Sequence, residues 1–319
     1  MQLMKDNSIF DAIGVDGMKY ADFRKKLTPR YVKVWKDIAT GYVVIMLIMA
    51  ASIYLESASY VYFWMFIPLI SLVVGYTFAY IQLFCHEAIH FNLHPNKAKN
   101  DVLANIFLFS WVGNDIDQCR ERHWQHHQYF GTTKDPENIY FKPISTQLIF
   151  SILSSIYFVK NILIKRFVIL FYKMPFTKKR RQIFMFLVGL ILNLSILVIC
   201  FKSSYWQTAL IWLFAIIIFY PLFSTVRQIL ENRNRWADSK TDYKLVDHGK
   251  VMRTFNNDFF SRTFGGAGFN RKMLHQLDPE ISYTRFDDLE AFLKDCPKYW
   301  VEIYRSKTSY FDTYLWLVR

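Results

Sequence analysis

The segment VYFWMFIPLISLVVGYTFAYIQLFCHEAIH, residues 61–90, decides the class of this protein. From Val61 to Cys85 it carries no Asp, Glu, Lys or Arg, and a helix that crosses a bilayer needs roughly 20 apolar residues. His86 and His90 follow directly, and their spacing places both side chains on one face of a helix. Imidazole is a common ligand of transition metals, so this pair indicates metal chemistry at the end of a membrane span.

Three further stretches have apolar cores without charged residues: Ile38 to Leu55, Ile183 to Phe201 and Trp206 to Phe223. Short connections join the four stretches in pairs, which predicts two helical hairpins. The chain is 53% hydrophobic, more apolar than an average soluble domain. We therefore expect an all-α integral membrane protein, with four transmembrane helices in two hairpins and a cytoplasmic helical cap that carries the metal site.

Two weaker apolar stretches lie between the hairpins. Residues 102–112 are too few to cross a bilayer, so we expect a re-entrant or interfacial segment there. Residues 145–174 alternate apolar blocks with Lys160, Lys165 and Lys173. These lysines favour interfacial helices over an additional hairpin.

The order of these segments predicts one domain over residues 1–319. Residues 1–37 form a cytoplasmic lead-in. Residues 38–223 hold the membrane spans, with residues 86–182 as a cytoplasmic middle segment. Residues 224–319 form a cytoplasmic tail that completes the cap.

The net charge of +13 invites a nucleic-acid reading, but its distribution explains it otherwise. If the chain crosses four times, all Lys and Arg residues except Lys202 lie on one side of the membrane. The positive-inside rule then places both termini and the metal site in the cytoplasm of a multi-pass membrane protein. No nucleic-acid partner is expected.

A second histidine cluster reads His123-Trp-Gln-His126-His127, and its three imidazoles share one face of a helix. Packed against the first cluster, this helix would supply five imidazoles to one volume. Such nitrogen ligands suit iron, zinc and copper.

The first cluster also fits the His-Glu-x-x-His pattern of zinc proteases, in which Glu87 would be the general base. That reading leaves the second cluster unexplained, so it ranks low. Otherwise Glu87 lies about 100° around the helix from His86, and a structural role or support of a ligand is favoured over direct ligation.

The remaining histidines and the cysteines give weaker signals. His94 abuts Pro95 and is expected to cap or lie at the surface, and His248 is expected in solvent. The four cysteines show no CxxC spacing and are expected to be free thiols: Cys85, Cys119, Cys200 and Cys296.

HxxxH after the second span, HxxHH at residues 123–127 and four spans in two hairpins together resemble the membrane fatty acid desaturase and hydroxylase superfamily. The resemblance extends over residues 40–295. Its further matches are Arg120, Asp135-Pro136, the segment from Arg227 to Glu231 and the tail from His275 to Phe286.

The resemblance implies a pair of metal ions, normally irons, held by three His boxes. These ions activate dioxygen and remove hydrogen from an unactivated C–H bond, giving desaturation or hydroxylation. The implied substrate is a membrane lipid or acyl chain. A separate electron-donor protein is implied as well, since the chain shows no pattern of a fused cytochrome or ferredoxin.

By this resemblance the metal ligands are His86, His90, His123, His126, His127 and His275, while Asn232, Gln276 and Glu87 are candidates for ligands or for residues that support them. The third box is degenerate, because it reads Lys272-Met-Leu-His275-Gln276, with Lys and Gln where the family has His. Asn232 stands where His often follows Glu231.

These losses are expected to fall on one metal. One ion could keep His86, His90, His126 and His275, and the other little beyond His123 and His127. We expect one metal to bind firmly and a second to be weak or absent.

Four functions stay open. The first is oxidation of a lipid chain, by desaturation or hydroxylation. The second is a related oxygenase with a reduced metal site and a non-lipid substrate. The third is a family member that has lost catalysis and binds lipid, and the least favoured is a membrane zinc protease. The sequence indicates no substrate-binding residues.

Overall fold

The computed structural model describes residues 9–14, 17–58, 60–164, 168, 176–238, 240–247 and 249–318. His248 and part of the stretch 145–174 lie outside these residues. The α-helices are α1 (Tyr20–Lys25), α2 (Tyr31–Ser57), α3 (Phe63–Ile89), α4 (Lys97–Ala104), α5 (Ile116–Tyr129), α6 (Thr146–Leu153), α8 (Phe176–Lys202), α9 (Trp206–Phe214), α10 (Tyr220–Asn232), α11 (Phe259–Phe264), α12 (Lys272–Leu277), α13 (Phe286–Lys294), α14 (Pro297–Arg305) and α15 (Tyr310–Leu317).

Shorter 3-10 or π segments connect or continue these helices: η1 (Ile9–Asp11), η2 (Asn105–Phe109), η3 (Ser110–Val112), η4 (Asn138–Phe141), η5 (Phe158–Ile164), η7 (Ala215–Phe219), η8 (Phe269–Arg271) and η9 (Tyr283–Arg285). Among the described residues the named strands are β1 (Thr254–Phe255) and β2 (Lys307–Thr308), which pair in parallel. The protein is therefore built from helices, as expected.

Four helices in the described part of the chain are long and apolar enough to cross a membrane: Tyr31–Ser57, Phe63–Ile89, Lys178–Lys202 and Trp206–Asn232. They confirm the four predicted spans and extend several of them. Helix α3 continues beyond Cys85 to Ile89, so His86 belongs to the same helix as the second span. The fourth span runs from α9 through the π segment η7 into α10.

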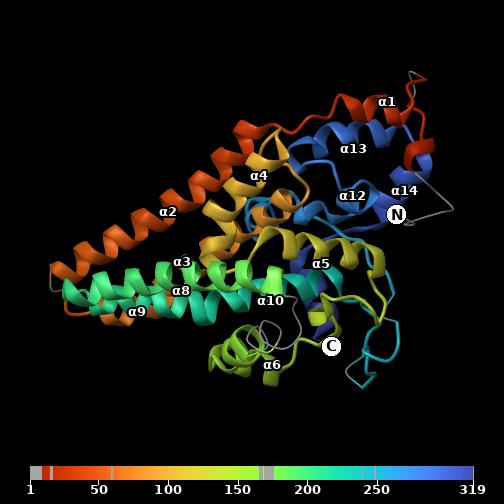
Figure 1. The fold of residues 1–319 in the computed structure, drawn as a ribbon. Coiled ribbons are helices and arrows are strands. Elements are labelled where there is room, and N and C mark those ends of the chain that lie inside the picture. Colours follow the sequence, from red (N-terminus) through yellow and green to blue (C-terminus); the bar gives the residue numbers. More distant parts are fainter. Residues whose placement is uncertain are drawn as a thin grey trace.

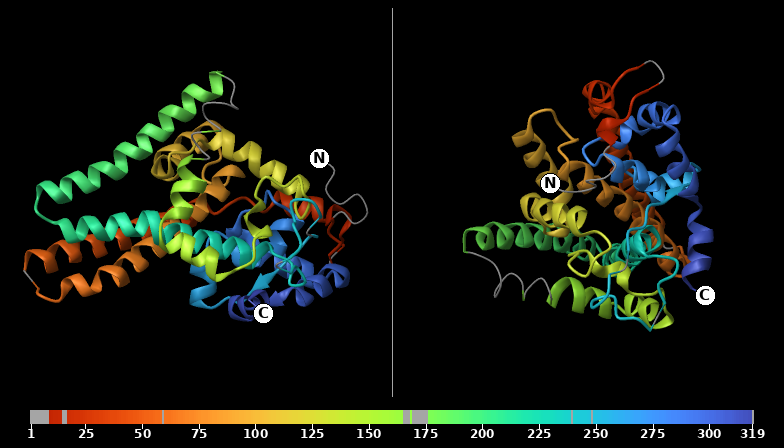
Figure 2. Two further views of the ribbon diagram at one scale, coloured as in Figure 1. Left: turned by 90° about the horizontal axis from the view of Figure 1, so that it is seen from below. Right: turned by 90° about the vertical axis from the view of Figure 1, so that its right-hand side faces the viewer.

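The two hairpins point in the same direction. In Figures 1 and 2 the turn between α2 and α3 and the turn between α8 and α9 lie at one end of the molecule, while both termini lie toward the other. Glu56 links the two turns, because its carboxylate accepts hydrogen bonds from the backbone N–H groups of Gln207 and Thr208, both at 2.9 Å. A carboxylate at the first turn of α9 also complements the positive end of that helix.

The two weaker apolar stretches are helical. Residues 102–112 fall in α4, η2 and η3, and the described part of 145–174 contains α6 and η5. Neither stretch contributes one of the four membrane-length helices found among the described residues. Their interfacial position stays a prediction.

The lead-in and the tail pack together at the end opposite the hairpin turns (Figure 1). Tyr20 and Leu27 share a hydrophobic cluster with Leu274, Leu289 and other tail residues. The Tyr20 hydroxyl also donates to Asp278 at 2.9 Å. These contacts hold the tail, and with it helix α12, against the ends of the membrane helices.

Candidate metal centre

The end of α3 fixes the first histidine pair. The helix closes at His90, and Phe91 follows with a φ of +62°. The N–H of Phe91 donates to the backbone carbonyl of Ala88 at 3.1 Å, and the N–H of Asn92 donates to the backbone carbonyl of Glu87 at 2.9 Å. This is the Schellman arrangement that ends a helix, here with Phe in the left-handed position where Gly is usual. The last turn, which carries both histidines, is thereby fixed.

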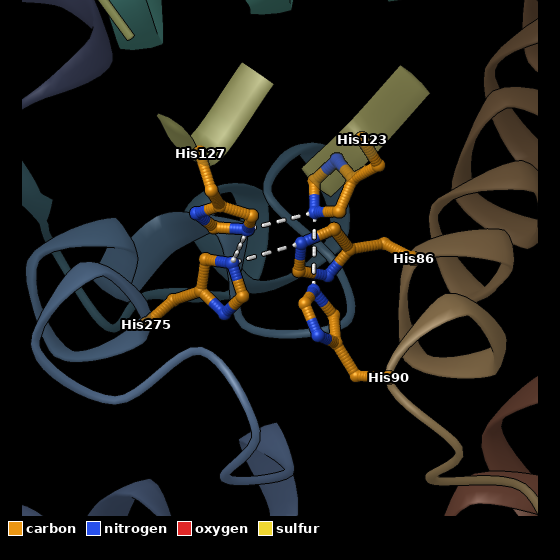
Figure 3. Close-up of side chains that lie close together, drawn as sticks. All are labelled: His86, His90, His123, His127 and His275. Carbon is orange, nitrogen blue, oxygen red and sulfur yellow. Dashed lines mark hydrogen bonds between the residues drawn. The ribbon is translucent and has the colours of Figure 1, made fainter. Parts of the chain in front are cut away.

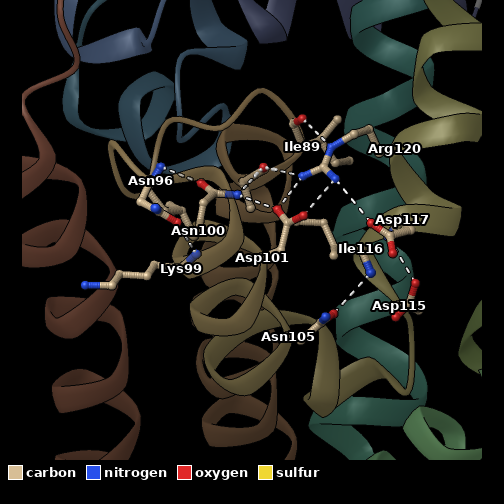
Figure 4. Close-up of polar contacts among 12 residues, drawn as sticks. Ile89, Asn96, Lys99, Asn100, Asp101, Asn105, Asp115, Ile116, Asp117 and Arg120 are labelled. Carbon is tan, nitrogen blue, oxygen red and sulfur yellow. Dashed lines mark hydrogen bonds and ion pairs between the residues drawn. The ribbon is translucent and has the colours of Figure 1, made fainter. Parts of the chain in front are cut away.

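Arg120 joins this helix end to α5, as Figure 4 shows. Its guanidinium donates to the carbonyl of Ile89 at 2.9 Å and to Asp101 at 2.6 Å. It also lies over the ring of Phe91, at 3.9 Å from the centroid. A planar guanidinium suits this combination of a fork of donors and a stacked face. The two helices that carry the His clusters are therefore fixed relative to one another.

All three histidines of the second cluster lie on α5. The Asp115 side chain caps this helix by accepting from the N–H of Asp117 at 3.0 Å. His123 and His127 are one helical turn apart, so their side chains project in the same direction. His123, His126 and His127 are all buried.

Five imidazoles from three helices converge on one point (Figure 3). Their Nε2 atoms lie 3.0 Å apart for His86 and His275, 3.0 Å for His90 and His123, 2.9 Å for His127 and His123, and 3.2 Å for His275 and His127. One nitrogen from each ring can be chosen so that all five lie within 4.8 Å of one another. At a metal–nitrogen bond of about 2.1 Å, neighbouring ligands of one ion are roughly 3 Å apart and opposite ligands roughly 4.2 Å apart. The five nitrogens thus match the ligand shell of a single ion after small adjustments.

Burial keeps these imidazoles neutral, which metal binding requires. It lowers the pKa of His123 below its ordinary value of 6.5 and lowers the pKa values of His90, His127 and His275 still further. Neighbouring histidines add to the effect, because a second positive charge beside the first is unfavourable. A neutral ring keeps a lone pair free for a metal ion.

His126 faces a different partner from its neighbours on α5. Its Nδ1 lies 2.8 and 2.9 Å from the carboxylate oxygens of Asp135, which is buried and also accepts from Tyr140. This contact makes Nδ1 the donor and directs the Nε2 lone pair away from Asp135. The resemblance suggested that His126 shares an ion with His86, whereas the structure groups His123 and His127 with His86.

The other candidate residues lie outside the five-histidine cluster. Glu87 is buried and accepts from the Ser282 hydroxyl at 2.7 Å, outside the five-histidine cluster. Lys272 is buried, and its amine donates to the side-chain oxygen of Asn232. Gln276 has a buried side-chain nitrogen with no hydrogen-bond partner among the described residues. His94 accepts from the N–H of Asn96 at 2.9 Å, in agreement with the capping role expected for it.

Two carboxylates of the site were not assigned a role by the sequence. Asp135 was identified only as part of the resemblance, and its contact with His126 comes from the loop after α5. Glu137 lies 3.6 Å from Nδ1 of His123, and no pattern in the sequence pointed to it. Both carboxylates reach the histidines because of how the loop after α5 folds, and the spacing of residues in the sequence does not predict that fold.

A cavity of about 210 Å³ adjoins the cluster. His86, His123, His126, His127 and His275 line it, together with Glu137, Glu231, Asn232, Lys272 and Gln276. The Lys272 amine and these carboxylates interact: burial lowers the pKa of Lys272, while Glu231 and Glu137 raise it. The site can therefore hold a metal ion at one side of this cavity.

No curated protein matches this chain. The sequence model of the family described as Fatty acid desaturase matches residues 62–307, which include the three helices α3, α5 and α12 that carry the five histidines. Since the match covers most of the chain and the histidine cluster lies within it, this protein belongs to the fatty acid desaturase family.

Proposed function

We propose that this membrane protein binds iron at the five-histidine cluster and uses it, with dioxygen, to oxidise an apolar chain by desaturation or hydroxylation. The observation that carries the proposal is the convergence of five buried, neutral imidazoles at the end of the membrane-length helix α3. The donor set fits iron, since imidazole nitrogen is one of its preferred ligands, and family membership supports iron over other metals.

Bound iron would supply the activation of dioxygen. The protein supplies placement around it. His86, His90, His123, His127 and His275 would hold the ion, and burial keeps their rings unprotonated. Arg120 fixes the relative position of α3 and α5, and Asp135 fixes the ring of His126 at the edge of the cavity.

Two further cavities support the proposal of a path for the substrate. A narrow cavity of about 10 Å³ shares Leu83 and Arg227 with the cavity at the histidines, and it shares Tyr80 and Thr263 with a larger one of about 350 Å³. Arg262 and Arg271 are among the basic residues that line the larger cavity. We propose that a lipid chain reaches the metal past Tyr80 while an anionic head group stays in the larger cavity. Binding of a neutral and an anionic lipid of equal chain length should then differ, and equal affinity would contradict this path.

We place the metal centre and both termini in the cytoplasm. The nearly one-sided distribution of Lys and Arg supports this orientation. The same basic face could dock a separate, acidic electron donor. If a tag at either terminus is cleaved by an added protease only after the membrane is permeabilised, the orientation is supported. Cleavage of the tag by the added protease in intact cells would contradict it.

The experiment for the reaction compares lipids from cells that express the wild type or the His127→Ala variant. Wild-type cells should accumulate a lipid that has lost two hydrogens or gained one oxygen, and the variant should not. The purified protein should repeat the conversion only with iron, dioxygen and a reductant. Conversion that persists after iron is removed would contradict the proposal.

Glu87→Gln separates oxygenase from protease chemistry. The carboxamide oxygen can still accept from Ser282, so an oxidase should keep most of its activity. A zinc protease would lose its general base and nearly all activity.

A family member that only binds lipid would show lipid binding that is insensitive to His127→Ala.

A further inference from the structure

The side of the cavity away from the five-histidine cluster is organised around Lys272. This residue lies on α12 one turn before His275, and it is only 4% exposed. Its Nζ lies 5.4 Å from the centroid of the Phe130 ring, and the His126 ring lies 5.1 Å from the same ring. The Lys272 amine therefore sits in the part of the cavity that His126 and Asn232 border.

The electrostatic surroundings of Lys272 are those of a buried cation. The carboxylates of Glu231, Glu137 and Asp135 all interact with its amine. Glu231 is paired with Arg227 at 2.5 Å, Glu137 also interacts with Arg122, and Asp135 contacts His126. Lys272 thus adds a positive charge to a group of carboxylates of which Asp135 and Glu231 are buried.

Few imidazoles lie on this side of the cavity. His123 and His127 belong to the five-histidine cluster, so His126 is the imidazole left beside Lys272. An ammonium group has three N–H donors and no lone pair for a metal. Asn232 already accepts from Lys272, so its oxygen is engaged as well.

We propose that the Lys272 ammonium, held by Asn232, occupies the place of a second metal ion, so that the protein holds one ion at the five-histidine cluster. The inference rests on the proposed function for the identity of that ion as iron, but the number of ions does not depend on any reaction. It differs from a vacant second site, because the positive charge there is supplied by the chain.

The test is the number of metal ions per chain at saturation. Purified wild-type protein in detergent is titrated with Fe(II), and separately with Co(II), without oxygen or substrate, and bound metal is counted by mass spectrometry after desalting. The wild type should bind one ion. Lys272→His combined with Asn232→His places two imidazoles beside His126 and removes the charge, so the count should double to two.

A matched control is Lys294→His, which adds a histidine at an exposed position and should leave the count at one. Two ions in the wild type would overturn the inference, and so would a folded double variant that keeps one. If the double variant does not fold, the wild-type count decides alone. A protein that binds one ion and oxidises nothing would refute the proposed function and leave this inference standing. A lipid oxidase that binds two ions would support the proposed function and overturn this inference.

Discussion

At the scale of single residues, two neighbouring histidines on α5 should behave differently. His127 lies in the five-histidine cluster, so His127→Ala should lower metal content strongly. His126 contacts Asp135 instead, so His126→Ala should retain the ion while it lowers activity. Metal analysis of both purified variants checks this. Equal loss of metal in the two would show that His126 is a ligand of the same ion.

The residue scale also shows where the sequence stops being informative. The spacing of the two clusters predicted that His86, His90, His123, His126 and His127 would meet, because each cluster lies on one face of a helix. Four of these histidines do meet, together with His275, whereas His126 lies outside the five-histidine cluster. The direction of Lys272 could not be predicted in this way. It depends on how α12 docks, and α12 is held by contacts with the distant lead-in residue Tyr20 and its neighbours.

At the scale of elements, Arg120 should determine how well α3 and α5 present their histidines. Arg120→Lys keeps the charge but loses the fork of donors that reaches Ile89 and Asp101. Metal affinity should fall by roughly 10- to 100-fold, as for other residues that position ligands. Competition with a chelator measures it, with the exposed Arg305→Lys as control. An affinity equal to that of the wild type would mean that helix packing alone sets the geometry.

The contact between α3 and the π segment η7 depends on a glycine. A Cβ on Gly75 would lie 2.5 Å from Cβ of Phe219 and 2.9 Å from the carbonyl of Ala215, and neither can move without moving the helix. Gly75→Ala should therefore cost about 1–3 kcal/mol, seen as a lower unfolding temperature in detergent. Gly41→Ala is the comparison and should cost less, because the new Cβ there would meet a side-chain atom, Cγ1 of the buried Ile81 at 2.5 Å, rather than backbone. Equal effects would contradict this reading.

At the scale of the whole molecule, the spans and the presence of a helical cap were predictable, but the packing inside the cap was not. Long uncharged stretches mark membrane helices because the bilayer sets their length. The cap joins α1, α12, α13 and α14 through contacts between residues far apart in sequence, such as Arg24 with Asp278 at 2.5 Å. No local pattern specifies such pairs. The number of histidines that reach the site is therefore a property of the cap as much as of the spans.

The buried histidines make the stability of the metal-free protein depend on pH. The pKa values of His90, His123, His127 and His275 lie below 6.5 in the folded state, whereas unfolding restores them to about 6.5. As pH falls below 6.5, these imidazoles bind protons in the unfolded chain but stay unprotonated in the folded chain. The free energy of unfolding should then fall by up to about 1.4 kcal/mol per pH unit for each such imidazole.

Thermal unfolding of metal-free protein between pH 7.5 and 5.5 checks this dependence. The unfolding temperature should drop toward acid pH, and His127→Asn should drop less, because it removes one of the buried imidazoles. His94→Asn is the matched control, since His94 lies outside the five-histidine cluster. If the wild type kept its unfolding temperature down to pH 5.5, the cluster would have to accept protons in the folded state. Protons would then compete with a metal ion for its rings below about pH 6.5, and burial would not be what keeps the rings neutral.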